Sequence, residues 1–432
     1  MLLLYNILML FGIMVGFPAI VPLILVSEKR RKTVRQRLGM IPIPRSPRQS
    51  PKPIWVHALS VGEVISTLPL IDRLTEHFKD RPVVFSASTK TGFDIANNLL
   101  KEKVHELFLF PYDLFLSVKH VTRVVDPALV IIVETDIWPN FLYEMKHRNV
   151  PVILANARLS KRSFNGYKRI SFFSVPLFLS FAKICTQSRE DAGRFNLLGI
   201  PGHKIKTTGN LKFDQEFKPV AASQIENLKH SMHLGPDQKI FLAGSTHKGE
   251  ETILADALAM IKKKYENYKF IIVPRNPQRA ASVCRILTSA GLAAIRMKEL
   301  QSGKPAEGFD VFVIDMIGLL GKLYAIADVA FVGGSLVNSG GHNPLEAAAF
   351  SKPLLWGPDM SDFAEIADML VKAGGALKIR DAKSIYESVV TITSDPLVAR
   401  QMGRAAYDFF CTHKGGAVKT LEVVNEYLSK TR

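Results

Sequence analysis

The feature that most constrains this chain is an alternation of short apolar runs with longer amphipathic stretches, which continues from residue 54 to residue 357. The runs are four to six residues long and rich in Val, Ile, Leu and Phe. Such runs are typical of parallel strands that are buried on both faces and joined by crossover helices. The pattern predicts an α/β chain with two doubly wound domains. The runs form two groups, at 54–58, 83–87, 106–110, 129–134, 152–156 and 184–187, and then at 240–244, 270–274, 311–315, 329–334 and 353–357.

The domain boundaries follow from the polar stretch between these two groups. A chain of 432 residues exceeds the usual size of a single core. Residues 212–236 contain no strand pattern and are the expected linker. We therefore expect Rossmann-like domains at 53–211 and 237–410. A C-terminal helix at 411–432 is expected to pack back on the first domain.

The N-terminal segment has the composition of a membrane anchor. Residues 1–26 carry no charge and, as a helix, exceed the roughly 20 residues needed to cross hydrocarbon. Positive charge follows this apolar run, which is the reverse of a cleaved signal peptide. We expect a retained anchor at 1–27, with the rest of the chain on the cytoplasmic side by the positive-inside rule. Pro18 and Pro22 would kink a spanning helix, so a monotopic or re-entrant insertion stays open.

Positive charge is concentrated beside this anchor. About half of the net charge of +17 lies in residues 28–52, where nine basic residues accompany Glu28 as the single acidic one. We expect this basic juxtamembrane segment to meet an anionic membrane surface, or else an anionic substrate. The chain has no basic stripe interleaved with aromatic residues, which argues against nucleic acid as a partner. Three widely spaced cysteines argue against a disulfide framework, and without a metal-ligand motif no metal site is expected.

The residues after each apolar run are candidate site residues, because ligands of open parallel sheets bind beyond the carboxyl ends of the strands. The first run leads into Ser60-Val-Gly-Glu63. This pattern is typical of a helix capping box, and capping alone would explain Glu63. The same carboxylate would also serve as a general base, and Gly62 would let a bulky acceptor approach the backbone. Both interpretations stay open at this stage.

Further charged residues follow other runs. Glu134 ends the run 129–134, where an acid at a helix start is an ordinary explanation. Arg158 is expected either to meet a phosphorylated acceptor or to be solvated. Lys212 and Arg275 are cations expected to face a cleft between the domains, although a surface position is the default for each.

Glycine-containing loops mark the second domain. Gly340-Gly-His-Asn-Pro-Leu-Glu346 precedes an alanine-rich helix, for which Asn343 is the expected N-cap. Paired glycines before a helix also form a place where free amides meet a phosphate, with Glu346 accepting from ribose hydroxyls. Ser245 and Thr246 lie in a shorter loop of this kind, suited to a phosphate or a leaving group.

The chain resembles the 3-deoxy-D-manno-octulosonic acid (Kdo) transferases of lipopolysaccharide and lipid A assembly. The resemblance implies a glycosyltransferase-B (GT-B) fold, in which an N-terminal acceptor domain and a C-terminal nucleotide-sugar domain face a cleft. One departure is Asn276, where a histidine is expected in this family. The resemblance covers nearly the whole chain and rests on the joint order of HALSVGEV, SASTKTG, VETDIWPN, NARLS, GNLKFD, AGSTHKGEE, VPRNPQR and GGHNPLEAA.

The resemblance also implies an activity and assigns residues to it. It implies inverting, metal-independent transfer of Kdo from cytidine monophosphate-Kdo (CMP-Kdo) to the lipid A precursor lipid IVA, at the inner membrane and without a cofactor. Glu63 would be the catalytic base, and Gly62, Glu134, Arg158 and Lys212 would lie at the cleft. The residues implied at the nucleotide site are Ser245, Thr246, Arg275, Gly318, Asn343 and Glu346.

Two alternatives of other kinds stay open. One is another GT-B nucleotide-sugar enzyme, such as an epimerase or a different glycosyltransferase. The other is a membrane-tethered, lipid-binding scaffold without activity, which would need no nucleotide pocket. The number of Kdo units transferred and the oligomeric state are also left open.

Overall fold

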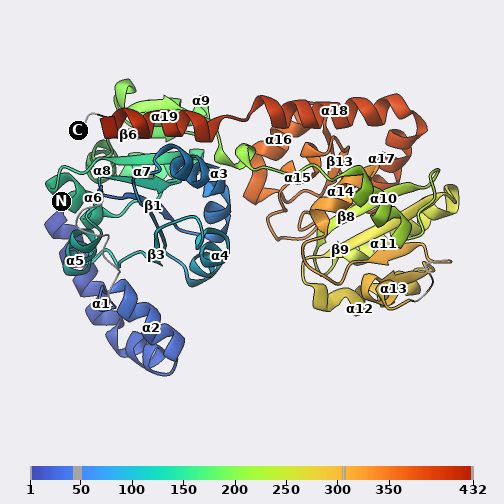
Figure 1. Cartoon of the computed structure of the whole chain (residues 1–432), viewed down its shortest axis with the longest axis horizontal. Helices are drawn as coiled ribbons and strands as arrows, with labels where there is room; N and C mark the ends of the chain where they lie inside the picture. Colours follow the sequence, from blue (N-terminus) through green and yellow to red (C-terminus); the bar gives the residue numbers. More distant parts are fainter. Residues whose placement is uncertain (1, 42–50, 304, 306–307, 430–432) are drawn as a thin grey trace. The chain divides into compact units, whose positions relative to one another are not determined.

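The computed structural model describes residues 2–41, 51–303, 305 and 308–429, and it divides into two compact units (Figure 1). Unit 1 comprises Met1–Glu216 and His413–Arg432, and unit 2 comprises Phe217–Thr412. The chain therefore passes from one unit to the other twice. Residues 42–50 of the expected basic segment, with Arg45 and Arg48, lie outside the described residues, as do residues 430–432 of the expected C-terminal helix.

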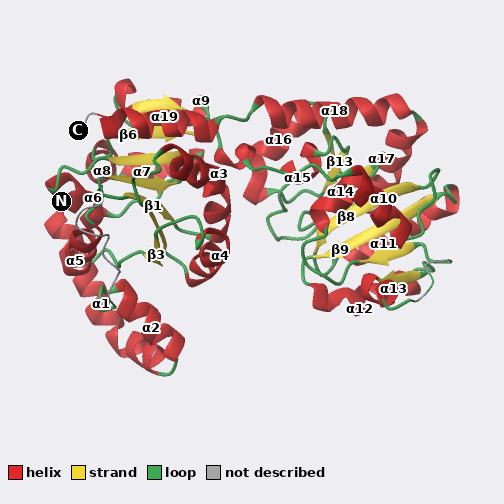
Figure 2. Cartoon of the chain, viewed as in Figure 1, coloured by secondary structure: helices red, strands yellow, loops and turns green. Residues whose placement is uncertain are grey.

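Unit 1 is built on a seven-stranded sheet in which neighbouring strands are parallel (Figure 2). The strand order is β3-β2-β1-β4-β5-β6-β7, so the sheet extends in both directions from the central pair β1 and β4. β1, β2, β4 and β5 are buried along their whole length, as expected for apolar runs covered on both faces. The strands are β1 (Ile54–Ala58), β2 (Val83–Ala87), β3 (Glu106–Leu109), β4 (Leu129–Val133), β5 (Val152–Ala157), β6 (Lys183–Thr186) and β7 (Ile205–Thr207).

Helices cover both faces of this sheet. One apolar layer packs α3, α4 and α19 on the sheet, and the opposite layer packs α5, α6, α8 and α9. The C-terminal helix α19 is thus part of the core of unit 1, although it follows unit 2 in the sequence. The helices are α1 (Leu2–Leu25), α2 (Glu28–Arg37), α3 (Val61–His77), α4 (Lys90–Leu100), α5 (Phe115–Val125), α6 (Pro139–His147), α7 (Lys161–Arg169), α8 (Ser171–Leu179), α9 (Arg189–Leu197) and α19 (Gly416–Ser429), with the 3-10 turns η1 (Gly202–Lys204) and η2 (Leu211–Asp214).

Unit 2 repeats this architecture. Its seven strands are also paired in parallel, in the order β10-β11-β9-β8-β12-β13-β14. A core of apolar side chains from α11, α12 and α17 covers one face. The strands are β8 (Lys239–Thr246), β9 (Tyr268–Pro274), β10 (Ala294–Arg296), β11 (Val311–Val313), β12 (Val329–Val332), β13 (Leu354–Trp356) and β14 (Ala376–Lys378). The helices are α10 (Ala222–Ser231), α11 (Glu250–Lys264), α12 (Ala280–Ser289), α13 (Met297–Gln301), α14 (Leu320–Ile326), α15 (Leu345–Ala349), α16 (Ala364–Lys372), α17 (Ala382–Ser394) and α18 (Pro396–Thr412), with η3 (Pro277–Arg279) and η4 (Ser361–Phe363).

Each of the apolar runs in the sequence forms a strand, but three further strands were not expected. β7, β10 and β14 are three residues long, and each lies at an edge of its sheet. An edge strand pairs on one side only and needs no long apolar run, which explains why the pattern missed them. The stretch 212–236 contains no strand, as expected, but it includes part of η2 and the whole of α10.

The N-terminal helix differs from all of these elements. Among the described residues, α1 is the one helix with the length and hydropathy to cross a membrane. No part of its most apolar window, Leu2–Ala19, is buried in the protein. The following helix α2 has the opposite character, with six basic residues and one acidic residue in ten.

Candidate active site

The strand order of unit 1 reverses between β1 and β4, which are neighbours in the sheet. In open α/β sheets, this reversal leaves a crevice beyond the carboxyl ends of the two strands. Glu63 lies in the first turn of α3, shortly after β1, and Glu134 directly follows β4. The topology therefore brings two carboxylates together that are far apart in the sequence.

A cavity of about 340 Å³ lies at this point of unit 1. Three of the predicted site residues line it, namely Glu63, Glu134 and Arg158. Gly62 is exposed instead, and a Cβ atom added there would meet no protein atom within 4 Å. The other residues that line the cavity are Leu59, Thr135, Asp136, Ser160 and Ser163.

Glu63 forms the capping box that its sequence pattern predicts. Its Oε2 accepts a hydrogen bond from the Leu59 amide at 2.5 Å, and its Oε1 accepts one from the Ser60 hydroxyl at 3.2 Å. The carboxylate nevertheless lines the cavity, with 9% of the residue exposed. One carboxylate therefore combines a capping position with access to a ligand.

The pKa of Glu63 is raised to about 7. Burial is the largest cause because it disfavours the charged form, and the neighbouring negative charges of Glu134 and Asp136 raise the pKa further. Hydrogen bonds from Leu59 and Ser60 oppose the shift. A carboxyl group with a pKa near 7 takes up and releases protons readily at neutral pH, which suits a general base.

Glu134 has a left-handed backbone, with a φ of 61°, which is uncommon for a residue that carries a side chain. Its amide donates to the Ala155 carbonyl of β5 at 2.8 Å, which fixes this turn to the sheet. Burial raises the pKa of Glu134, and the positive charges of Lys212 and Arg158 counteract the shift. Unit 1 thus places two of the predicted cations within electrostatic reach of Glu134.

A second left-handed residue, Asn156, positions the segment that carries Lys212. Asn156 has a φ of 54°, is fully buried in β5 and accepts a hydrogen bond from the Leu211 amide at 3.0 Å. The side chain of Asn210 accepts a hydrogen bond from the Lys212 amide, also at 3.0 Å. These bonds hold η2 beside the end of β5, so Lys212 lies with unit 1 rather than in a free linker.

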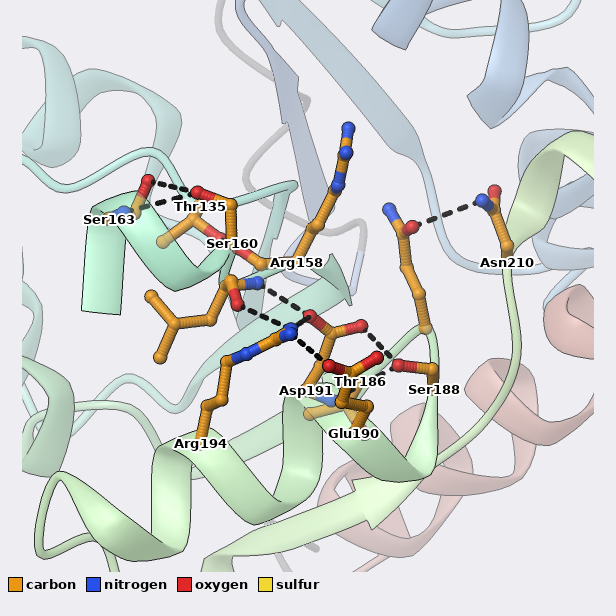
Figure 3. A network of polar contacts seen from close by, with 12 residues as sticks. Thr135, Arg158, Ser160, Ser163, Thr186, Ser188, Glu190, Asp191, Arg194 and Asn210 are labelled. Carbon is orange, nitrogen blue, oxygen red and sulfur yellow. Dashed lines mark hydrogen bonds and ion pairs between the residues drawn. The ribbon is translucent and has the colours of Figure 1, made fainter. Parts of the chain in front are cut away.

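The turn after Arg158 is held by a network of polar contacts (Figure 3). The Thr135 hydroxyl donates to the Arg158 carbonyl. The next residue, Leu159, donates from its amide to the buried Asp191 at 2.8 Å and accepts from Arg194 at 2.9 Å. Figure 3 shows the Arg158 side chain pointing away from these contacts. The network therefore fixes the backbone and leaves the guanidinium to the cavity that Arg158 lines.

His57 is a residue of this site that the sequence analysis missed. It is fully buried in β1, and its Nε2 lies 3.3 Å from Asp136 Oδ2 at the cavity wall. Its Nδ1 lies 2.9 Å from Ser86 Oγ, and its ring stacks on Phe110. His57 therefore positions Asp136 from inside the sheet. A histidine within an otherwise apolar run was the sequence signal for this role.

In unit 2 the strand order reverses between β8 and β12. The predicted site residues Ser245 and Thr246 are the last two residues of β8, and not part of a loop after it as expected. Ser245 has a left-handed backbone, with a φ of 57°. Thr246 is fully buried, and its hydroxyl donates to Glu251 at 3.1 Å. The Thr246 side chain therefore faces the protein interior.

Glu250, which the sequence analysis did not single out, organises the loops at this point. Glu250 is fully buried, and its carboxylate accepts hydrogen bonds from backbone amides at the end of β8 and in the loop after β12. These amides are therefore not free to bind a ligand. The amides that donate to Glu250 are those of His247 at 2.8 Å, Gly334 at 2.8 Å, Ser335 at 3.0 Å and Leu336 at 2.9 Å.

Arg275 and Glu346 interact beside these loops. The Arg275 amide donates to the Thr246 carbonyl at 2.9 Å. Burial raises the pKa of Glu346, and the positive charge of Arg275 opposes the shift. Burial lowers the pKa of His342 to about 4, with further contributions from Arg275 and His247. The His247 and His342 Nε2 atoms are 2.9 Å apart, a pairing that the sequence analysis did not predict.

Asn343 and Gly318 complete the predicted set. Asn343 Oδ1 accepts from the Leu345 amide at 3.0 Å, but α15 begins at Leu345, so Pro344 is the N-cap and the predicted helix start was one residue too early. Gly318 is exposed before α14 with a φ of 93°, a conformation that favours glycine. Within the described part of the chain, no group of three or more His, Cys, Asp and Glu side chains is arranged to hold a metal ion.

Comparisons of the sequence point to one family. A sequence model described as 3-Deoxy-D-manno-octulosonic-acid transferase (kdotransferase) matches residues 32–215. The chain is 32% identical over 405 residues to a 3-deoxy-D-manno-octulosonic acid transferase of Haemophilus influenzae, covering 94% of this chain and 93% of that one. It is 28% identical over 393 residues to a 3-deoxy-D-manno-octulosonic acid transferase of Bordetella pertussis, covering 89% of each.

Comparison with solved structures identifies the fold. A UDP-GlcNAc 2-epimerase from Neisseria meningitidis, bound to UDP-GlcNAc, matches with a TM-score of 0.59 at 16% identity, over 87% of this chain and 99% of that one. A glycosyltransferase from Rickettsia africae matches with a TM-score of 0.55 at 14% identity, over 87% and 98% of the two chains. At these identities the likeness shows the fold alone, which is of the GT-B type.

Proposed function

Because this chain belongs to the family of 3-deoxy-D-manno-octulosonic acid (Kdo) transferases, and is therefore a glycosyltransferase, we propose that it transfers Kdo from CMP-Kdo to the lipid A precursor lipid IVA. The observation that carries this proposal is the cavity of unit 1. It is lined by Glu63, a carboxyl group with a pKa of about 7, and by the cation Arg158. A base and a cation in one cavity suit a substrate that has both a reacting hydroxyl and an anionic group.

Glu63 is the proposed general base. The acceptor hydroxyl must lose its proton as its oxygen bonds to the anomeric carbon of Kdo, and CMP leaves with the electrons of the broken bond. A carboxylate in hydrogen-bond reach of that hydroxyl takes the proton, which typically contributes 10² to 10⁴ in rate. Because the attack and the departure occur on opposite faces of one carbon, this single displacement inverts its configuration. The reaction as proposed uses no cofactor beyond the donor.

The cations of unit 1 are assigned to the acceptor. Arg158 lines the cavity, and the positive charges of Lys212 and Arg158 both lower the pKa of Glu134. A phosphorylated lipid precursor would bring negative charge to this group, and a guanidinium matches the geometry of a phosphate in two hydrogen bonds. The exposed position of Gly62 leaves room for a bulky acceptor next to the base.

The donor is assigned to unit 2. Arg275 would stabilise the phosphate of the departing CMP, which is already anionic and needs charge stabilisation more than a proton. Glu346 would accept hydrogen bonds from the ribose hydroxyls. The neighbouring positions Ser245, Thr246, Gly318 and Asn343 would shape the loops that surround the nucleotide.

The proposed setting is the cytoplasmic face of the inner membrane. Support comes from α1, which has the length and hydropathy of a membrane helix, and from the basic helix α2 that follows it. Basic residues beside an apolar segment favour the cytoplasmic side and anionic lipids. A lipid acceptor would be encountered at this surface.

The test of the activity uses the full-length protein in detergent, with CMP-Kdo and purified lipid IVA. Mass spectrometry should show the lipid gaining the mass of one or more Kdo residues while CMP is released in equal amount. CMP release without a modified lipid would contradict the assignment of the acceptor. An altered sugar nucleotide with no transfer would support the epimerase alternative, for which the structural likeness now shows only the fold.

The assignment of the donor site predicts a selective loss of nucleotide affinity. Glu346→Ala should weaken CMP binding about 10- to 150-fold, because a charge-assisted hydrogen-bond pair is lost, corresponding to roughly 1.5 to 3 kcal/mol. Titration calorimetry measures this affinity. Glu387→Ala, at an exposed position of α17, is the matched control. Unchanged affinity together with lowered thermal stability would show that Glu346 has a structural role only.

A further inference from the structure

The first turns of α1 are bound to the body of unit 1. The Tyr5 hydroxyl donates to the buried carboxylate of Asp113 at 3.0 Å. The side chains of Asn6 and Asn140 exchange two hydrogen bonds, at 2.8 and 2.9 Å. The Tyr5 ring also lies 6.4 Å from that of Phe173 in α8. This end of the apolar helix is therefore attached to the unit that carries the proposed active site.

The contacts of Asp113 show that this attachment is built into the fold. Asp113 accepts hydrogen bonds from the amides of Asn140 and Phe141 at 3.0 and 2.9 Å, and so it also caps the first turn of α6. Two polar residues, Tyr5 and Asn6, interrupt an otherwise apolar N-terminal sequence, and both have partners in this small group. Their presence in the helix is explained by these partners.

The far end of the α1–α2 segment returns to the same loop. The backbone carbonyl of Arg37 accepts a hydrogen bond from the Tyr112 amide at 2.9 Å. The Nε atom of the Arg37 side chain donates a hydrogen bond to the Phe110 carbonyl, also at 2.9 Å. The Arg37 guanidinium also lies over the Tyr112 ring at 4.1 Å. Tyr112 is the residue immediately before Asp113, so the loop after β3 holds both ends of the segment. Figure 1 shows α1 and α2 as an extension beside α5 and α6.

These contacts are incompatible with a helix that crosses a bilayer. A spanning α1 would place Tyr5 and Arg37 on opposite sides of a hydrocarbon core about 30 Å thick. The structure instead ties both residues to one loop of one unit. We propose that α1 does not span the membrane but enters one leaflet from the side of the catalytic units, with both ends of the α1–α2 segment held at the same membrane surface.

Charge and exposure around the segment fit a lipid surface as its partner. α1 is uncharged, and α2 carries six basic residues, which would remain at the level of the anionic headgroups. Two large apolar side chains stand beside the attachment points: Phe172, 86% exposed, adjoins Phe173, and Leu116, 78% exposed, follows Asp113 by three residues. We assign these two side chains to the same lipid-facing surface as α1.

A cross-linking experiment in membranes tests the topology. The full-length protein, with Cys185, Cys284 and Cys411 replaced, carries Asn6→Cys with Asn140→Cys and is embedded in phosphatidylethanolamine and phosphatidylglycerol vesicles. A bifunctional thiol reagent that fluoresces only when both arms react should join this pair, in vesicles and in detergent alike. Val15→Cys with Asn140→Cys is the control, because Val15 lies nine residues, about 14 Å, further along the helix.

The outcomes separate the topology from the activity. Reaction of the Asn6 pair in detergent but not in vesicles would overturn the proposal, because α1 would then leave the body to cross the bilayer. Absence of reaction in both vesicles and detergent would overturn the contact between Asn6 and Asn140 itself. The pair Tyr5→Cys and Phe173→Cys repeats the test with Asn140 intact. The inference rests on the proposed membrane setting, but Kdo transfer to detergent-solubilised lipid IVA is measured on the same variants. Absence of transfer by the wild-type protein and by these variants alike, with cross-linking intact, would refute only the proposed function.

A second measurement tests the lipid-facing side chains. Phe172→Trp and Leu116→Trp should each add tryptophan fluorescence that brominated lipids quench, relative to the wild-type protein. Leu99→Trp is the control, because Leu99 is 42% exposed but lies on α4, which packs on the opposite face of the sheet from α5 and α8. Quenching of the control alone, or of none of the three, would remove Phe172 and Leu116 from the proposed surface.

Discussion

At the scale of single residues, Glu63 shows how one side chain meets two demands. Its carboxylate accepts hydrogen bonds from Leu59 and Ser60 as the partner in a capping box, and it also lines the cavity of unit 1. Capping lowers the pKa of a carboxylate, but burial and two neighbouring carboxylates prevail and raise it to about 7. The structural and catalytic interpretations are therefore compatible, and substitution can separate their contributions.

We predict that Glu63→Gln keeps the fold and the affinity for CMP but loses about 10² to 10⁴ in turnover. Glutamine is also favoured at this position of a capping box and still accepts a hydrogen bond, but it cannot take the proton of the attacking hydroxyl. Single-turnover transfer assays at saturating donor and acceptor measure the effect. Glu76→Gln, at an exposed position in the same helix, should transfer Kdo at the wild-type rate. Near wild-type turnover in the Glu63 variant would exclude this residue as the base.

The raised pKa of Glu63 predicts the pH dependence of the reaction. Only the ionised carboxylate accepts a proton, so the rate should rise about tenfold per pH unit below 7 and level off above it. The effect on stability has the opposite sign. Because folding raises this pKa, the contribution of Glu63 to stability is greatest below its usual pKa and is lost as the pH rises through about 7. A transfer rate that stays constant between pH 5.5 and 8 would contradict the role as base.

At the scale of elements, buried carboxylates hold the loops that follow the strands. Glu250, in the first turn of α11, accepts four backbone hydrogen bonds from the ends of β8 and β12. The adjacent Glu251 pairs with Arg279 at 2.7 Å and with the Thr246 hydroxyl. In unit 1, Asp191 accepts a hydrogen bond from the amide of the residue after Arg158. The side-chain carbonyl of Asn156 likewise accepts one from the amide of the residue before Lys212. The loops of both proposed sites are thus supported from the interior.

We predict that Glu250→Gln destabilises unit 2 by about 3 kcal/mol, because an amide group offers one acceptor oxygen where the carboxylate offers two. Some of the four backbone amides would then be buried without a partner. Urea denaturation followed by a probe in unit 2 measures the loss. The same substitution at Glu387, whose side chain is 60% exposed, should change the stability by less than about 0.5 kcal/mol. Equal effects at the two positions would show that Glu250 is not a structural support.

At the scale of the whole molecule, the chain builds unit 1 from both of its ends. The side chain of Asp214 accepts hydrogen bonds from the amides of Gly415 and Ala417 at 2.6 and 2.8 Å, which joins η2 to the start of α19. α19 then completes the apolar layer that also contains α3 and α4. In α1, by contrast, no part of the most apolar window is buried in the protein. The core of unit 1 therefore depends on the C-terminus and not on the N-terminal helix.

We predict that removal of residues 1–26 moves the protein from the membrane to the soluble fraction while both units stay folded. The apolar window of α1 contributes nothing to either core, so the melting temperature should fall by only a few degrees, from the lost contacts of Tyr5 and Asn6. Sedimentation with vesicles in high salt, together with calorimetry, measures both properties. A truncated protein that resists the salt wash would show that another surface anchors the chain independently of α1.

The sequence by itself determined the strands of both sheets other than β7, β10 and β14, the capping box at Ser60 and the apolar and basic helices at the N-terminus. These features are local, since an apolar run, a cap or a block of charge acts within a few residues. Only the tertiary structure decided that Glu63, Glu134 and Lys212 belong to one electrostatic group, that His57 supports Asp136, and that Tyr5 binds Asp113. Such contacts join residues that are distant in the chain, because strand order rather than sequence spacing sets which loops meet. The edge strands β7, β10 and β14 were also decided by the tertiary structure, since each is defined by its pairing with a neighbouring strand.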